Sequence, residues 1–454
     1  MALVPFPAAF YKESSVENKF PFDRSKYRPK NYIHIDKSLE FKKVEGYVCD
    51  PDKIAKHSFL PLIHYIIETP KYKVDKIKQR HIRYAGHLDS YIYKYYADQL
   101  NSYYNLYCEM SDIDECSIAY RNNKIGKANV DFAAEIFNLI KKQSSSYIIV
   151  GDFKSFFDTL DHKMIKVRMK EVLNIDTLPS DWFNIYKSII KYGSIKKEVL
   201  EELPHVKNDF GKKQSYFSSV NEFRKIKNKK KNLQMEVNTN SFGIPQGTPI
   251  SAVIANVYSI GFDKSMKELA DNYEGVYRRY SDDFILVIPS KQDSIINVKE
   301  IYKQIEKYSI LNKMKLEDNK SKVLKCNNGQ VIDANTNESS KIDYLGFIFD
   351  GKTVKLRDKS ISKFYKKANK LIRHAKKIQK NKNLKKLPYR RSIYNLYTDM
   401  GKSSRRGNFI SYAKRAQEVF DKRSPETDNQ ILKQIENRKR NIEKRLGYRI
   451  HVKL

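Results

Sequence analysis

The chain has 454 residues, of which 40% are apolar and 12% aromatic, so it can build a hydrophobic core and is not a disordered polycation. Lys and Arg number 87 against 53 Asp and Glu, a formal net charge of +34. This excess indicates a polyanionic partner, with nucleic acid favoured over an anionic membrane.

Cysteine and histidine usage argues against a disulfide framework and against structural zinc. The four cysteines form no CxxC pair, and the nine histidines show no zinc spacing. The first residues lack a signal-peptide pattern, and no apolar run approaches the ~18 residues that a membrane span needs. We therefore expect a cytoplasmic protein without membrane contact.

The first segment with candidate chemistry follows a short apolar run. Residues 147–150 are apolar and β-branched, which is typical of a buried strand, and Asp152 comes directly after them. A helix is expected to open near Asp161 and His162. An aspartate at the end of a buried strand and before a helix is positioned like a metal ligand.

A polar insertion at residues 205–240 precedes the second segment. Its basic run at 224–231 fits equally a mobile loop that contacts phosphates and a loop that is merely soluble.

The second segment places Gly243 and Gly247 before an apolar helix. Thr248 is predicted to be the N-cap and Pro249 the first helical residue. Glycines there would let the backbone approach a flat ligand closely.

The third segment, residues 276–289, is predicted to be a hairpin with Asp282 and Asp283 at its tip. Two adjacent carboxylates repel each other unless a cation neutralises them, although such pairs also occur in ordinary turns. With Asp152 they would make three hard oxygen donors, the ligand type that Mg²⁺ prefers. Two such ions can clamp the attacking and leaving oxygens of a phosphoryl transfer.

Most of the excess charge lies at the C-terminal end. Residues 351–454 hold 32 Lys and Arg against 8 Asp and Glu, a net of +24, whereas the first 350 residues have a net of +10. Apolar residues recur every three or four positions over 361–378, and a second helix over 431–446 is expected to stop at Gly447. This pattern favours a helical module that grips nucleic acid over a solvated surface.

The three segments, in this order, resemble the palm of reverse transcriptases of the bacterial kind found in group II introns, retrons and defence systems. The resemblance extends over about residues 70–370. The matching blocks are residues 79–93 and 119–129 for the fingers, 152–158 for motif A, 243–251 for motif B, 280–283 for motif C, 313–322 for motif D and 342–347 for the primer grip.

This resemblance implies that Asp152, Asp282 and Asp283 are catalytic and hold two Mg²⁺ ions, with the carbonyl of Phe153 as a further ligand. Phe157 falls at the steric-gate position, where an aromatic ring excludes a ribose 2′-hydroxyl and favours dNTPs.

The remaining roles implied by the resemblance concern the nucleotide and the primer. Gln246 would line the incoming dNTP. The candidates for its triphosphate are Arg80, Arg121 and Lys320, each of which could equally be a surface ion-pair partner. The residues expected at the primer and template are Tyr280, Leu345, Gly346, Lys366 and Lys367.

We expect an α+β right-hand polymerase. Its parts would be an N-terminal extension of unassigned role (1–70), fingers (71–145), a palm with an antiparallel sheet (146–350, with the basic insertion near 205–240) and a basic helical thumb (351–454). The expected partners are a non-coding RNA template, an RNA/DNA hybrid and dNTPs, and a homo-oligomer stays open.

The subgroup most resembled is the defence-associated "unknown group" of reverse transcriptases, in which a dedicated non-coding RNA is copied into cDNA that acts against phage. Ser281 replaces the usual alanine of motif C, the retron patterns NAxxH and VTG are absent, and no endonuclease-like segment follows the basic helices. The alternatives are a group II intron-type mobility enzyme, untemplated or protein-primed synthesis, an RNA polymerase, and a non-catalytic RNA-binding scaffold.

Overall fold

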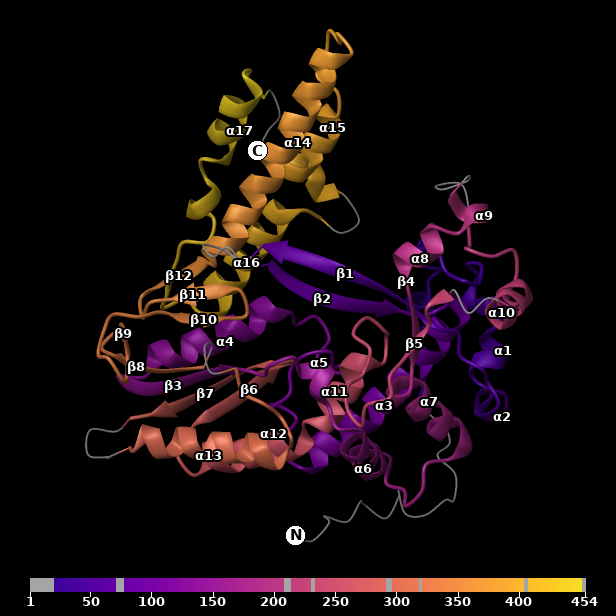
Figure 1. Cartoon of the computed structure of the whole chain (residues 1–454). Helices are drawn as coiled ribbons and strands as arrows, with labels where there is room; N and C mark the ends of the chain where they lie inside the picture. Colours follow the sequence, from indigo (N-terminus) through magenta and orange to yellow (C-terminus); the bar gives the residue numbers. More distant parts are fainter. Residues whose placement is uncertain are drawn as a thin grey trace.

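The computed structural model describes residues 20–70, 77–207, 214–229, 233–290, 296–317, 321–403 and 407–450. Helices and largely antiparallel sheets form an α+β structure with the three parts of the predicted right hand, which we call fingers, palm and thumb (Figure 1). Within these ranges, no helix combines the length and the apolar character that a membrane span requires.

The palm is built on a five-stranded antiparallel sheet. Its strands, in spatial order, are β6 (Val276–Tyr280), β7 (Asp283–Pro289), β3 (Ser145–Asp152), β8 (Lys322–Asn327) and β9 (Gln330–Asp333). The predicted buried strand and the predicted hairpin are therefore neighbours, because β7 pairs with both β3 and β6.

Alternate side chains of this sheet enter two different cores. Ile149 and Leu286 pack into the core that holds α12 (Ile260–Asp271) and α13 (Val298–Leu311). Their strand neighbours Ile148 and Val287 join a second core with α4 (Asn129–Lys142) and the thumb. Figure 1 shows α12 and α13 on one side of the sheet and α4 on the other. Burial of both faces explains the nearly continuous apolar sequence of β7.

The fingers contain a four-stranded sheet in the order β2 (Ile77–Tyr84), β1 (Leu62–Pro70), β4 (Gly193–Lys196) and β5 (Glu236–Val237). One strand of this sheet, β1, lies in the predicted N-terminal extension (1–70). Part of residues 20–60 packs on α3 (His87–Met110); for example, the hydroxyl of Tyr27 donates to Asp98 at 2.8 Å. Short helices of this segment are η2 (Arg24–Lys26), η3 (Phe41–Lys43), α1 (Glu45–Val48) and α2 (Pro51–Ala55).

Several helices lie between β3 and β6 in the sequence, and the start of one of them, α6 (His162–Leu173), is where the sequence predicts. Apart from α12, the others are α5 (Phe156–Thr159), α7 (Ser180–Ile190), α8 (Lys197–Glu201), α9 (Pro204–Lys207), α10 (Val220–Lys229) and α11 (Ser251–Tyr258). Asp161 caps α6 as predicted, accepting from the Met164 N–H at 2.9 Å. The predicted N-cap Thr248 is wrong: α11 begins at Ser251, and the two hydroxyls, 2.6 Å apart, hold the preceding turn.

The thumb combines a small sheet with basic helices, and it begins before the predicted boundary at residue 351, because the first two strands of this sheet lie in the range predicted for the palm. Its strands are β10 (Ile342–Tyr344), β11 (Phe347–Phe349), β12 (Thr353–Leu356) and β13 (Asp428–Asn429), and its helices are α14 (Asp358–Asn381), α15 (Arg390–Tyr397), η5 (Asp399–Ser403), α16 (Phe409–Arg423), η6 (Lys433–Ile435) and α17 (Arg438–Leu446). The predicted helix over 361–378 is confirmed within α14. The predicted helix over 431–446 is divided into η6 and α17, and it stops at Gly447 (φ +84°) as predicted.

A buried ion pair connects the palm sheet to the helices behind it. Arg279 of β6 and Asp263 of α12 have fully buried side chains and are joined by two hydrogen bonds of 2.8 and 2.7 Å. Asp263 also accepts from the hydroxyl of Tyr277 at 2.8 Å. Because both charges lie inside the protein, each depends on the other for stability.

We predict that Asp263→Asn lowers the free energy of unfolding by about 3–5 kcal/mol, because it leaves the Arg279 charge buried without a counter-ion. Urea denaturation measures this loss. The matched control is Asp271→Asn on the same helix, which breaks an exposed pair with Lys267 and should cost less than about 1 kcal/mol. Equal losses for the two variants would contradict the assigned role.

Candidate active site

Backbone pairing brings the three predicted catalytic aspartates to one end of the palm sheet. Asp152 is the last residue of β3 and lies opposite Asp283, the first residue of β7. The N–H of Phe153 donates to the carbonyl of Asp282 at 3.1 Å, so the turn of the hairpin is bonded to the end of β3. Asp152 is buried, whereas Asp283 is exposed.

The hairpin turn is held from inside by Arg279. Ser281 has a φ of +62°, and its carbonyl accepts a 2.9 Å hydrogen bond from Nη1 of Arg279. The same guanidinium bonds Asn256 of α11 and Ser117 in the segment after α3, both at 3.2 Å. Sequence reasoning missed this residue, although in β6 its position alternates with partly buried ones and a buried arginine requires a buried acid.

The Asp283 carboxylate lies in an electrostatically unfavourable environment. The protein packed around the Asp283 carboxyl group removes part of its hydration, although the residue keeps contact with solvent. This partial desolvation and the charge of Asp282 raise the pKa of Asp283 to about 6, and the cations Arg357 and Lys78 offset the shift only partly. Lys78 belongs to β2, so the fingers reach the acidic end of the palm sheet.

The three aspartates at this end of the palm sheet are suitable ligands for a divalent cation, although their side chains do not converge on one point. In the described part of the chain, no three His, Cys, Asp or Glu side chains are grouped as a metal site requires. Carboxylate oxygens are nevertheless the ligands of hard cations, and a cation beside Asp282 and Asp283 would relieve their repulsion.

The glycine loop of motif B is fixed between motif A and the fingers. The N–H groups of Gly243 and Ile244 donate to the carbonyls of Leu160 and Phe157 at 2.8 and 2.9 Å. On the other side, the carbonyl of Gln246 accepts from the Arg83 N–H at 2.8 Å.

Two glycines in this loop permit conformations and contacts that other residues would not. Gly247 has a φ of +123°, and a Cβ there would lie 2.7 Å from the Arg83 carbonyl oxygen. Gly243 has a φ of +88°, and a Cβ there would lie 3.0 Å from the carbonyl oxygen of Asp158. The loop therefore fixes the backbone of Phe157 and Gln246, whose side chains are both partly exposed, relative to each other.

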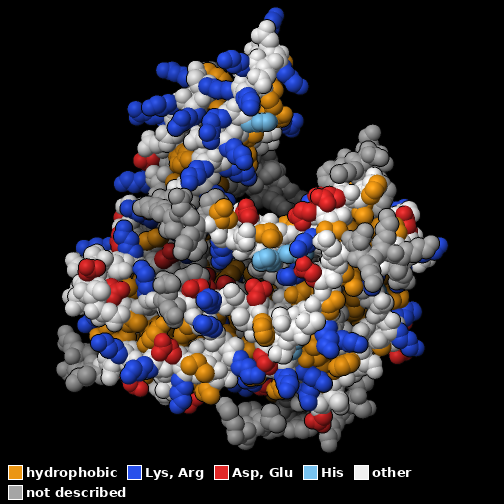
Figure 2. Space-filling view, viewed as in Figure 1, with side chains coloured by type: hydrophobic (Ala, Val, Ile, Leu, Met, Phe, Trp, Pro, Cys, Tyr) orange, Lys and Arg blue, Asp and Glu red, His pale blue; other side chains and the backbone are white. Residues whose placement is uncertain are grey.

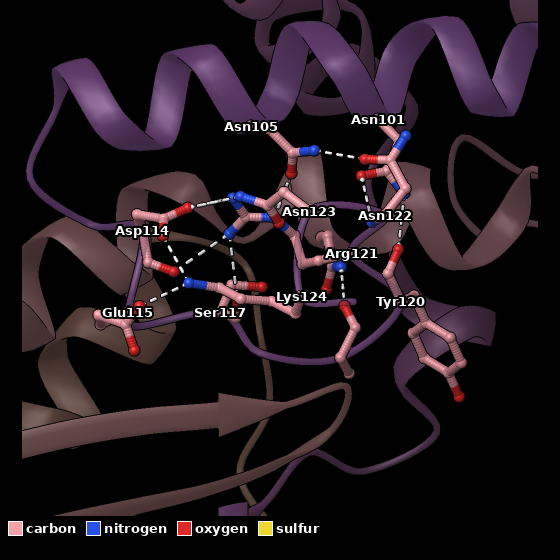
Figure 3. Close-up of polar contacts among 12 residues, drawn as sticks. Asn101, Asn105, Asp114, Glu115, Ser117, Tyr120, Arg121, Asn122, Asn123 and Lys124 are labelled. Atoms are coloured by element: carbon pink, nitrogen blue, oxygen red, sulfur yellow. Dashed lines mark hydrogen bonds and ion pairs between the residues drawn. The ribbon is translucent and has the colours of Figure 1, made fainter. Parts of the chain in front are cut away.

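The structure gives Arg121 a structural role in place of the predicted contact with the triphosphate. Its guanidinium is fully buried and bonds Asp114, Asn105 and the Ser117 carbonyl oxygen, the last at 3.0 Å (Figure 3). Lys124 pairs with Asp114 in the same network. Arg121 therefore orders the segment after α3 and is not available to a triphosphate, because its charge is already neutralised inside the protein.

Of the other two candidates for the triphosphate, the structure describes only Arg80. Arg80 is exposed on β2, opposite Ile67 of β1, and remains available to a ligand. Lys320 lies outside the described residues. Sequence reasoning missed Lys78, two residues before Arg80 and on the same face of the strand.

The predicted primer residues surround the junction of palm and thumb. Leu345 and Gly346 form the two-residue turn between β10 and β11, with φ values of +49° and +96°. Asn129 of α4 donates to the Leu345 carbonyl at 2.9 Å. Tyr280 is half-buried, with its ring 6.3 Å from that of Tyr120.

The predicted thumb lysines are open to solvent. Lys366 and Lys367 are both exposed on α14. Figure 2 shows Lys and Arg side chains spread over the thumb.

We predict that Asp283→Asn raises the melting temperature at pH 7.5 and that the gain disappears near pH 4. The folded-state pKa of about 6 lies above the ordinary 3.8, so the native protein loses stability as the pH rises from about 4 to 6. The neutral amide escapes that loss. Asp176→Asn, at an exposed position, should change little at either pH. A destabilised Asp283→Asn variant at pH 7.5 would contradict the electrostatic strain.

Comparison with known proteins identifies the family. The family model described as reverse transcriptase (RNA-dependent DNA polymerase) matches residues 94–349, more than half of the chain. No curated protein matches the sequence.

Similar solved structures include two telomerases. Apo telomerase from Candida tropicalis, truncated from the C-terminal domain, is 15% identical with a TM-score of 0.39, and the match covers 69% of this chain and 59% of that one. Telomerase from Candida albicans in complex with a TWJ fragment of telomeric RNA is 12% identical with a TM-score of 0.40, covering 89% and 65%. The chain thus spans less than two thirds of either length.

Enzymes of the matched family generally use divalent metal ions. The family match over residues 94–349 includes the sheet, the hairpin and the glycine loop described above. The chain therefore belongs to the family described as reverse transcriptase (RNA-dependent DNA polymerase).

Proposed function

We propose that the chain is an RNA-directed DNA polymerase. Asp152, Asp282 and Asp283 would form its catalytic centre and bind two Mg²⁺ ions, with the Phe153 carbonyl as a further ligand. The observation that carries the proposal is the register of β3 and β7, which sets Asp152 opposite Asp283. The raised pKa of Asp283 supports it. When bound, the ions would activate the primer hydroxyl and neutralise the charge that develops on the pyrophosphate.

The other residues of the protein would position the carboxylates and the nucleotide for the reaction. Arg279 fixes the turn that carries Asp282, so the carboxylates need little rearrangement before the chemical step. Phe157 would act as the steric gate: its carbonyl is bonded to motif B, which limits how far its ring can withdraw from a ribose 2′-hydroxyl. Gln246 would line the nucleotide, and Arg80 with Lys78 would contact its triphosphate.

The primer and its template would run from this centre to the thumb. The Leu345–Gly346 turn and Tyr280 would hold the primer strand. Lys366 and Lys367 would contact phosphates of the RNA/DNA hybrid, reading its A-form backbone and not its base edges.

We predict that the double variant Asp282→Asn/Asp283→Asn lowers dNTP incorporation on a primed RNA template by at least about 10³-fold, because it removes charge on which transition-state stabilisation depends. Primer extension with purified protein measures it. Asp176→Asn serves as the control and should keep full activity. A melting curve of the double variant separates lost chemistry from lost folding. Full activity would instead support a non-catalytic carboxylate pair.

We also propose the biological setting. The chain would be a defence-associated reverse transcriptase that acts in the cytoplasm and copies a dedicated non-coding RNA into cDNA against phage. The support is the pattern of its motif blocks, the departures in and around motif C, and a thumb with a net charge of +24. Group II intron-type mobility is the nearest alternative, and the genomic sequence on either side of the gene distinguishes it.

A further inference from the structure

The end of the thumb that points away from the palm carries an unusual combination of side chains. We call it the thumb tip and define it as residues 374–397 with residues 438–450. Figure 1 shows α14, α15 and α17 extending away from the palm sheet to this end. Residues 374–397 contain eight Lys and Arg and no Asp or Glu. Such a one-signed surface attracts a polyanion at a distance from the catalytic carboxylates.

Aromatic rings stand among these cations. The guanidinium carbon of Arg390 lies 5.9 Å from the ring centroids of both Tyr394 and Tyr448. The left-handed conformation of Gly447 ends α17 and turns the chain so that Tyr448 comes beside α15. The Tyr448 side chain is 37% exposed, so its ring is both oriented by the arginine and open to solvent.

A third ring is held outward by the backbone. Tyr389, the N-cap of α15, has a φ of +59°, in the region that non-glycine residues rarely adopt. Its side chain is 48% exposed, and its ring centroid lies 5.6 Å from that of His374 on α14, with an interplanar angle of 31°. Burial does not compensate for this conformation, which suggests that the exposed ring contacts a ligand.

We propose that the thumb tip binds unpaired nucleotides of a nucleic-acid strand, with bases stacked on Tyr389 and Tyr448 and phosphates beside the surrounding lysines and arginines. A duplex presents phosphates but hides the faces of its bases, whereas an unpaired loop offers both. A phosphate-only grip would use lysines without exposed rings. This site goes beyond the proposed catalytic role, because it lies away from the palm sheet and needs neither dNTPs nor metal.

Fluorescence anisotropy with the full chain, without dNTPs or divalent metal, tests this inference. The probes are an RNA hairpin with an unpaired loop, the fully paired RNA duplex of the same length, and the DNA hairpin of the same sequence. Tyr389→Ala/Tyr448→Ala should bind the RNA hairpin about tenfold more weakly and leave duplex binding unchanged. The slope of log affinity against log salt should stay the same, because the phosphate contacts remain.

Two controls separate stacking from folding. Tyr273→Ala, at a palm tyrosine that is 38% exposed, should leave all three affinities unchanged, and Tyr389→Phe should keep hairpin binding because stacking needs the ring and not the hydroxyl. Parallel losses for RNA and DNA hairpins identify any single strand as the ligand, and a loss confined to RNA identifies the RNA. Equal losses for hairpin and duplex, or no loss, overturn the proposal.

Discussion

A guanidinium without contact to solvent lies where the palm sheet, α11, α12 and the segment after α3 meet. The five N–H bonds of Arg279 are directed at Asp263, Asn256, Ser117 and the carbonyl of Ser281. A buried charge is tolerated only when its counter-ion and hydrogen bonds are all in place, so these elements have one arrangement relative to the hairpin turn. The position of Asp282 and Asp283, and their mutual repulsion, depend on that arrangement.

The thumb is fixed to the palm in a similar way, although its charge makes it look like a separate module in the sequence. Side chains from one face of the palm sheet, from α4 and from α14 to α17 share one core. Polar contacts reinforce the join: Asn129 bonds the Leu345 carbonyl, and Arg423 of α16 pairs with Asp131 and Glu135 of α4. Helix α4 therefore sets the distance between the acidic end of the palm and the basic helices that would hold the hybrid.

The sequence predicted the elements whose signals are local. The β-branched run before Asp152, the hairpin over 276–289 and the apolar stripe of α14 each depend on neighbouring residues, and the structure has all of them. The predicted tip of the hairpin is displaced by one residue, because Asp283 is the first residue of β7. The features that sequence reasoning left open or assigned differently depend on residues far apart in the chain. Strand β1 pairs with β4, about 130 residues later, and Arg121 finds its acid only when the segment after α3 folds back. The roles of the site residues remain predictions that the fold now makes specific.

The central claim is that the protein copies one RNA into DNA and that Asp152, Asp282 and Asp283 are its catalytic residues. The most direct measurement is to purify the protein from its native locus and to sequence the RNA and DNA that accompany it. The account predicts one discrete RNA with complementary cDNA, and loss of that cDNA in Asp282→Ala/Asp283→Ala. DNA without a complement in the bound RNA would contradict templated synthesis, and bound RNA without DNA, unchanged by the double substitution, would contradict the catalytic role.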